Sequence, residues 1–486
     1  MLKKKSMAIN AGMNSIQTIC RMIFPLITFP YITRVLGVEN IGMYNFCTSV
    51  ISYFTLIAGL GISTFAIREG SKYRDDCEKM SDFASEVFSI NAIATVISYC
   101  LLAIVIIIIP TLKGNAKILF VLSTSIAFTT AGCEWIFNIY EDFSYIAIRS
   151  IAFQFISMLL MFLFVKSEKD VLNYAIITVV SSSGASLLNA FSRRRYCKVL
   201  FCINSEMKRM IIPILVLFAN TIATTIYVNS DTTMVGAIAG NYYTGLYSVA
   251  TRIYLIVKQV LSAMIVVSIP RLSALIGQKK TKEFENVGNR IINMLFVIIV
   301  PAMIGLYVIA DNVVLILSGS EYVEAVPSLR ILTIALFFSL FSWFYTSCVL
   351  IPCGKEKIVL KVTIFAAVAN VILNLILIPI WKHNAAAFTT VIAEGISMIA
   401  CMQYGKKNFH IRVSIRDMIS VAIGCVVVYV ICTITNSAIE SLALSTILSV
   451  LLAAMGYFAI LLLMKNHIVL DIWYEIKQHI RLRMSK

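Results

Sequence analysis

Two apolar segments of this chain carry polar side chains at helical spacing. In residues 9–32 the stripe consists of Asn10, Asn14, Gln17 and Arg21. In residues 211–237 it consists of Asn220, Thr224, Tyr227 and Asp231. Both stripes advance by four, three and four positions, which places their members on one face of a helix. Amides, hydroxyls and an arginine on one face can bind a polar or anionic solute, and a lone carboxylate can bind a proton or a cation.

The helices that follow these two segments carry similar faces. The helix predicted at 41–67, after the first segment, carries Asn45, Ser49 and Ser52. The helix predicted at 245–275, after the second segment, carries Ser248, Arg252 and Gln259. A polar face within a membrane must point at protein or water. The alternatives are a hydrated cavity and interhelical hydrogen bonds that hold a bundle together. We favour the cavity because the stripes are long and recur.

Charged residues also stand well inside apolar spans. They are Arg21, Glu134, Asp231, Arg252, Lys258 and Glu394. Each costs about 2.5–3.5 kcal/mol at the centre of a membrane helix, so each needs a partner or water. We expect Arg21 to meet Glu394 near mid-depth, and Asp231 to lie at the depth of Arg252. Lys258 is predicted to face away from the cavity, and Glu134 to lie at the interface.

Composition identifies the elements that position these residues. Of the 486 residues 59% are hydrophobic and 14% are charged, whereas soluble chains have about 25% charged residues. Apolar runs of about 20 residues match the ~30 Å hydrocarbon layer. The predicted fold is therefore an all-α integral membrane protein of about 14 transmembrane helices. The spans are 9–32, 41–67, 84–109, 117–139, 145–165, 171–191, 211–237, 245–275, 291–310, 327–351, 358–381, 385–404, 417–436 and 443–464.

The net charge of +16 could suggest nucleic-acid binding. The distribution of the positive residues along the chain instead indicates which segments face the cytoplasm. With the amino terminus inside, the inner segments hold 30 Lys and Arg residues and the outer segments hold seven. This bias predicts that both termini are cytoplasmic. Twelve cysteines and four histidines show no metal-ligand spacing, and no outer loop holds a cysteine, so we expect neither a metal site nor a disulfide framework. The first apolar run has no signal cleavage site and is expected to stay as a helix.

A repeat divides the chain. The motif G-x4-G-x-Y occurs at Gly37–Tyr44 and again at Gly240–Tyr247, 203 positions later, and each Tyr precedes an arginine (Arg68, Arg271) by 24 positions. Both copies start inside, which predicts a parallel repeat of two six-helix lobes around a central cavity. The predicted parts are an N-terminal lobe (1–210), a C-terminal lobe (211–404), two further helices (405–464) and a cytoplasmic amphipathic tail (465–486).

Three stretches resemble bacterial polysaccharide flippases of the multidrug/oligosaccharidyl-lipid/polysaccharide exporter superfamily. They are Phe24–Tyr44, Glu134–Tyr145 and Asn229–Ser273, the last with Asn229-Ser230-Asp231 and Pro270-Arg271-Leu272-Ser273. The resemblance covers nearly the whole chain. It implies a plasma-membrane protein, not an enzyme, that moves undecaprenyl-diphosphate-linked glycans (capsule, O-antigen or teichoic-type precursors) to the outer leaflet by alternating access.

The same resemblance suggests roles for the charged residues. Arg21 and Arg252 correspond to helices one and eight of the cationic cavity of lipid II flippases, whereas the second helix has Ser49 and no arginine, which argues against a peptidoglycan precursor. The cavity set is Arg21, Asn14, Gln17, Asn220, Thr224, Asp231, Arg252 and Gln259. The diphosphate would enter at the cytoplasmic mouth of the cavity beside Arg68, Lys72 and Arg271. Residue type alone favours a simpler interpretation, in which these cations only reflect the excess of Lys and Arg in cytoplasmic segments. We expect no cofactor; Asp231 or Glu394 would carry a coupling H+ or Na+.

Other functions fit parts of the pattern. A multidrug cation antiporter shares the fold but usually has twelve helices and an acidic cavity. A membrane glycosyltransferase or polymerase would need a large outer loop with catalytic residues, and here the outer loops are short. A scaffold role would leave the buried charges without a purpose. Membrane lipids, and the polymerase and glycosyltransferases of the same pathway, are the expected partners.

Overall fold

The computed structural model describes residues 7–412 and 414–471, and contacts between residues divide the chain into two compact units, Met1–Gly245 and Leu246–Lys486. Much of the predicted amphipathic tail lies outside the described residues. The division falls inside a helix, and the predicted boundary at residue 210 stays a prediction.

The first unit is built from helices that follow the predicted apolar runs. Its helices are α1 (Met7–Gly59), α2 (Ile62–Gly70), α3 (Cys77–Ile108), α4 (Pro110–Gly114), α5 (Ala116–Gly132), α6 (Glu134–Ile139), α7 (Phe143–Phe164), α8 (Val171–Ser192), α9 (Met207–Ile238) and the start of α10 (Asn241–Gly277), with short turns η1 (Ser71–Tyr73), η2 (Glu168–Asp170) and η3 (Arg193–Arg195). Helix α1 packs on α3, α7 and α9, and α5 packs on α8. Asp76 precedes α3 and accepts hydrogen bonds from the backbone N–H groups of Lys79 and Glu78. The hydrogen bonds from the backbone and side chain of Lys79 are the main reason that the pKa of the Asp76 carboxyl lies below its usual value.

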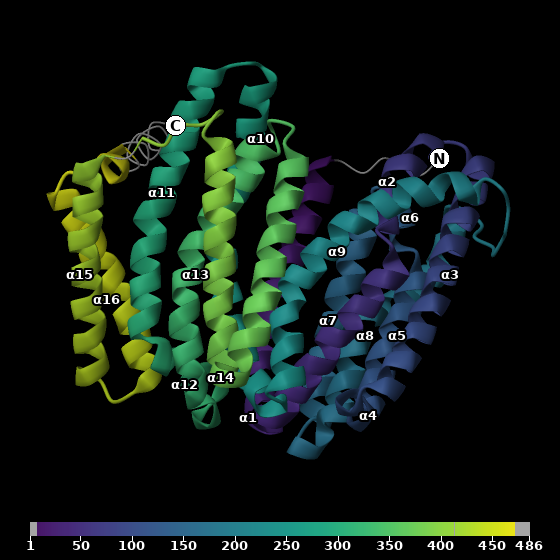
Figure 1. The fold of residues 1–486 in the computed structure, drawn as a ribbon, viewed down its shortest axis with the longest axis horizontal. Helices are drawn as coiled ribbons and strands as arrows, with labels where there is room; N and C mark the ends of the chain where they lie inside the picture. Colours follow the sequence, from purple (N-terminus) through teal and green to yellow (C-terminus); the bar gives the residue numbers. More distant parts are fainter. Residues whose placement is uncertain (1–6, 413, 472–486) are drawn as a thin grey trace. The chain divides into compact units, whose positions relative to one another are not determined.

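The second unit continues along α10. It contains α11 (Thr281–Val308), α12 (Ala310–Ser318), η4 (Ser320–Ala325), α13 (Val326–Phe344), the π-helical turn η5 (Tyr345–Leu350), α14 (Glu356–Gly405), α15 (Ile415–Ala438) and α16 (Leu442–Leu463). Helix α13 packs on α14 and α11, α11 packs on α15, and α15 packs on α16. Figure 1 shows α15 and α16 as a pair beside α11.

Two long helices each contain one residue with a non-helical backbone. Gly37 (φ 73°, ψ 173°) interrupts α1 between the predicted spans 9–32 and 41–67. Lys382 (φ 54°, ψ −129°) interrupts α14 between 358–381 and 385–404. Among the described residues, eleven helical stretches are long and apolar enough to cross a membrane, and α5 is apolar but shorter. The membrane class is confirmed, and the number fourteen stays a prediction.

The outer surfaces of both units are apolar. Val216 and Val267 are 67% and 79% exposed, and many isoleucines and leucines are similarly uncovered. Apolar patches on this scale are costly in water. The long apolar helices and their bare surfaces therefore share one explanation, which is a lipid environment.

The two repeated glycine motifs touch each other within the first unit. A Cβ built on Gly42 would lie 1.8 Å from the carbonyl oxygen of Asn241, and one built on Gly245 would lie 2.1 Å from the carbonyl oxygen of Val38. Residues 38 and 241, like residues 42 and 245, are separated by the repeat offset of 203 positions. The contact is therefore reciprocal between the two copies of the motif. Only glycine permits this approach of α1 to the start of α10.

Candidate functional site

The stripe on α1 is partly buried. Gln17 is buried, and its amide nitrogen has no hydrogen-bond partner among the side chains and backbone that the structure describes. Arg21, one turn further on, is exposed. The side chains of Asn14 and Asn220 lie outside the described residues. Within the described part of this stripe, an amide and a guanidinium are thus placed one turn apart on the same helix.

Helix α9 contacts the second half of α1 through hydroxyl groups. Thr233 Oγ1 donates to Ser49 Oγ at 2.9 Å and lies 3.3 Å from the Tyr53 hydroxyl. Ser49 itself donates to the carbonyl of Phe46. Ser49 is buried in this α1–α9 seam, so at this position the polar face holds helices together. On α9, Asp231 is buried and Thr224 is exposed.

The second unit contains a buried ion pair between α10 and α14. Lys258 Nζ lies 3.1 Å from Glu394 Oε1, and Lys258 also lies 5.5 Å from the centre of the Tyr254 ring. The ion pair supplies Glu394 with a partner within the second unit that the sequence did not indicate. The predictions that Lys258 faces away from the cavity and that Arg21 meets Glu394 stay predictions. Arg252 and Gln259 on the same helix are exposed. The pair places a carboxylate and an ammonium deep among apolar helices, where charges are functional by default.

The first unit contains a second buried ionic group. Arg149 on α7 is 5% exposed, and its Nη2 donates to Glu134 Oε2 at 2.7 Å. Its Nη1 donates to Asn189 Oδ1 and to the carbonyl of Ala185 on α8. Arg149 is one of the 30 Lys and Arg residues assigned to inner segments; the structure buries it against α6 and α8, and its side of the membrane stays a prediction. Glu134, expected at the interface, is the partly exposed partner of this pair.

A helix break places Glu134 beside Arg149. Helix α5 ends at Gly132, Cys133 adopts a left-handed backbone (φ 43°), and α6 begins at Glu134. The guanidinium of Arg193 donates to the carbonyl of Ala131 at 2.8 Å, which satisfies one carbonyl at the end of α5. The break is therefore held by two arginines from neighbouring segments.

Two of the three cations predicted at the cytoplasmic mouth, Arg68 and Lys72, form ion pairs. Arg68 Nε lies 3.1 Å from Glu69, and Lys72 pairs with the same carboxylate. Glu69 was overlooked, although its place between the two cations in sequence signals such pairing. Arg271 is exposed near the end of α10. A phosphate group that binds Arg68 and Lys72 would have to compete with the Glu69 carboxylate, and this competition lowers the affinity of the two cations for phosphate.

Other groups were overlooked because the sequence offers little sign of them. They include Thr233, Asn189 and a buried cluster in which Thr389 donates to Asn374, which in turn donates to Asn370. Among the described residues no three His, Cys, Asp or Glu side chains come together as metal ligands. All twelve cysteines are free thiols.

These features define a multi-pass α-helical membrane transporter with polar and charged groups inside its helical units. The chain belongs to the polysaccharide biosynthesis protein family, whose model matches residues 7–276; the MatE model matches residues 217–376. An Escherichia coli (strain K12) protein whose name describes an O-antigen transporter is 22% identical over 79% of this chain and 93% of its own length. The capsular polysaccharide biosynthesis protein CapF of Staphylococcus aureus is 20% identical over 82% of this chain and 97% of its own.

Solved structures share the fold. The lipid II flippase MurJ in an inward closed conformation superimposes with a TM-score of 0.76 at 16% identity, covering 94% of this chain and 99% of that one. An inward-facing multidrug resistance MATE family transporter gives a TM-score of 0.63 at 16% identity, covering 80% of this chain and 94% of that one. The predicted superfamily and transporter fold are confirmed.

Proposed function

We propose that this protein is a flippase that carries a lipid-linked oligosaccharide from the inner to the outer leaflet of the plasma membrane, with both termini in the cytoplasm. The observation that carries the proposal is the polar stripe on α1, with Gln17 and Arg21 one turn apart, inside the 7–276 match to the polysaccharide biosynthesis family. The relatives named for O-antigen transport and capsule biosynthesis support the substrate class.

The residues would divide the work by chemistry. Arg21 and Arg252 would bind the diphosphate, since guanidinium groups bind phosphate oxygens in a bidentate way. Gln17, Asn14, Asn220, Thr224 and Gln259 would offer hydrogen bonds to sugar hydroxyls. The glycan would cross in a hydrated interior while the prenyl tail stays in lipid. Polymerase and glycosyltransferases of the same pathway would supply and consume the substrate.

Replacing Arg21 by Ala is expected to lower glycan export by at least about tenfold, because a charged hydrogen bond contributes about 1.5–3 kcal/mol. Arg21→Lys should retain part of the export, since lysine offers one point charge in place of the planar fork. Surface glycan of a flippase-deficient strain that expresses each variant measures the effect. Arg194→Ala, an exposed arginine in η3, is the matched control. Full export by Arg21→Ala at normal membrane abundance would contradict the assignment.

A multidrug antiporter is the second candidate, favoured by the MatE match and by the MATE structure with a TM-score of 0.63. Transport assays in reconstituted vesicles distinguish the two candidate functions. The flippase should move a fluorescent polyprenyl-diphosphate oligosaccharide and leave an organic cation dye unmoved. Dye efflux that survives Arg21→Ala would support the antiporter.

We also propose that Glu394, with Lys258, couples transport to protons. A carboxylate 3.1 Å from an ammonium can release its partner when it takes up a proton. Glu394→Gln is expected to abolish the dependence of transport on a pH gradient while substrate binding persists, as measured by vesicle transport with and without the gradient. Asp311→Asn, which removes the carboxylate of the more exposed Asp311–Arg330 pair, is the control. Unchanged gradient dependence in Glu394→Gln would exclude this role.

A further inference from the structure

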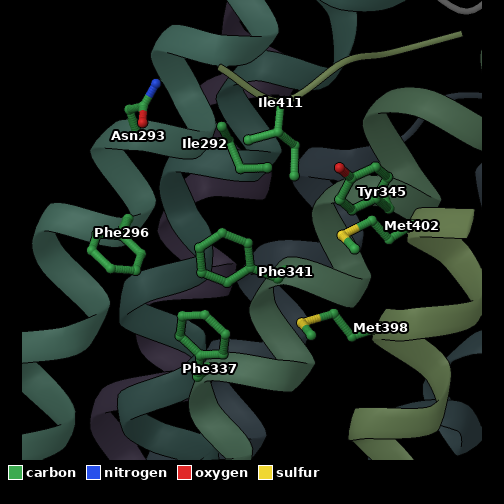
Figure 2. Close-up of a pocket in the computed structure, with 9 residues that line it drawn as sticks. All are labelled: Ile292, Asn293, Phe296, Phe337, Phe341, Tyr345, Met398, Met402 and Ile411. Atoms are coloured by element: carbon green, nitrogen blue, oxygen red, sulfur yellow. The ribbon is translucent and has the colours of Figure 1, made fainter. Parts of the chain in front are cut away.

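An apolar pocket opens between α11, α13 and α14 in the second unit. We call it the Phe337 pocket; it is lined by Ile292, Asn293, Phe296, Phe337, Phe341, Tyr345, Met398, Met402 and Ile411. Figure 2 shows the rings of Phe337 and Phe341 and the thioethers of Met398 and Met402 around one space. The amide of Asn293 and the hydroxyl of Tyr345 lie toward the end where Ile411 stands. The pocket is thus apolar along its length, and polar groups lie beyond one end of it.

A short segment of the chain lies at that end of the pocket. Residues 405–412 join α14 toward α15, and Phe409 fits against Gly288, whose added Cβ would lie 2.5 Å from the ring. Asn289 Nδ2 donates to the carbonyl of His410, and Asn293 Nδ2 donates to the carbonyl of Arg412, both at 2.9 Å. We call residues 405–412 the strap. These two hydrogen bonds fix the backbone of the strap to α11.

The side chains of the strap separate by polarity. Ile411 lines the pocket, whereas the side chains of His410 and Arg412 are 69% and 70% exposed beside it. Lys406 and Lys407 are exposed in the same strap. Glu285 accepts from His410 at 3.1 Å and from Arg412 at 3.5 Å, and is the one acidic partner that the structure gives these two side chains in its described part. Cations outnumber this carboxylate, so the end of the pocket is suited to an anionic group.

We propose that the Phe337 pocket and the strap form a binding site for an anionic glycerophospholipid of the membrane. One acyl chain would lie along Phe337 and Met398, and the head-group phosphate would contact Arg412 and Lys407. Basic pockets between membrane helices bind anionic head groups in this way, and arginine binds phosphate oxygens by paired hydrogen bonds.

The length of the pocket decides between occupants. From Phe337 to Tyr345 is eight residues, which is about 12 Å of helix. One leaflet contributes about half of the ~30 Å hydrocarbon layer, so the length of an acyl chain of one leaflet is close to that of the pocket. A polyprenyl tail is much longer and would leave most of its carbons outside.

Photocrosslinking tests the proposal in the full-length protein. The photoreactive residue benzoylphenylalanine replaces Phe337 in vesicles that hold equal amounts of phosphatidylcholine and phosphatidylglycerol, and mass spectrometry identifies the attached lipid. The matched control places it at Val368, an exposed position on α14. Phosphatidylglycerol should be enriched about fivefold at position 337, since one basic side chain near a membrane surface contributes about this factor. At position 368 the adducts should follow the bulk ratio.

Charge variants show what the enrichment depends on. Lys407→Gln with Arg412→Gln should return the adducts at position 337 to the bulk ratio. Lys279→Gln with Lys282→Gln, in the turn before α11 and in its first turn, should leave the enrichment in place. Adducts that match the bulk ratio at position 337 would reduce the pocket to ordinary annular contact and overturn the proposal. Displacement of the phospholipid adducts by added polyprenyl phosphate would overturn it too, since the pocket would then belong to the substrate tail. If the Phe337 variant fails to fold, benzoylphenylalanine at Met398 reports on the same space.

Discussion

Replacement of Gly42 by Ala is expected to abolish export and to lower the stability of the protein by at least about 3 kcal/mol, at the upper end of what overpacking usually costs. The added methyl carbon would lie 1.8 Å from the Asn241 carbonyl oxygen and 2.6 Å from the Gly245 backbone nitrogen. These are backbone atoms, so no side-chain rotation can relieve the overlap. The helix start must move away, and the reciprocal approach of Gly245 to Val38 is lost with it.

The experiment compares thermal unfolding in detergent with surface glycan in cells. Gly245→Ala should reproduce the defect, because its Cβ would lie 2.1 Å from the Val38 carbonyl oxygen. Gly59→Ala in the same helix α1 is the matched control, since no atom lies within 4 Å of its added Cβ; it should leave both measurements unchanged or raise stability slightly. Normal export and normal unfolding by Gly42→Ala would show that this contact is not needed.

Replacement of Glu134 by Ala is expected to destabilise the first unit by about 3 kcal/mol. The loss leaves the guanidinium of Arg149 charged and buried, and breaking a buried pair in this way costs about 3–5 kcal/mol. We take the lower figure because the Glu134 side chain is 44% exposed, so solvent screens part of the interaction. Thermal unfolding in detergent and abundance in the membrane measure the effect.

A double-mutant cycle separates the charge from the packing. Glu134→Ala with Arg149→Met removes both charges, and its stability should lie above that of Glu134→Ala alone, because an apolar side chain replaces the stranded cation. Arg74→Ala, which breaks the more exposed Arg74–Glu141 pair, should change the unfolding midpoint much less. If Glu134→Ala and the double variant unfold at the same temperature, the Glu134–Arg149 ion pair does not stabilise the helix break.

The fold could be predicted largely because length and hydropathy determine it. Apolar runs define the helices, and the breaks at Gly37 and Lys382 occur where short polar segments separate predicted spans. The repeat was visible in the spacing of its glycines. Its reciprocal contact was not, because spacing along the chain says nothing about which turn meets which.

Side-chain partners could not be predicted in the same way. The angle of Lys258 around α10 gives its direction but not the identity of the neighbouring helix, and α14 brings Glu394 there. The burial of Arg149 could not be predicted, because a charge near a predicted helix end is usually solvated. Its hydrogen bonds to Glu134 on α6 and to the Ala185 carbonyl on α8 hold it inside the first unit instead. For Arg21, Arg252 and Arg271 the sequence predicts a role that the export assays must test.

The reciprocal glycine contact also bears on how such a chain could arise. When Gly42 meets Asn241 and Gly245 meets Val38, each motif presents the same surface to its counterpart, which is the property of an isologous interface between identical subunits. A half-length ancestor carrying one G-x4-G motif would already have paired with a second copy of itself through that surface. Gene fusion would then have preserved an existing homodimer, and later divergence could give the stripes on α1 and α9 different charges without disturbing the junction.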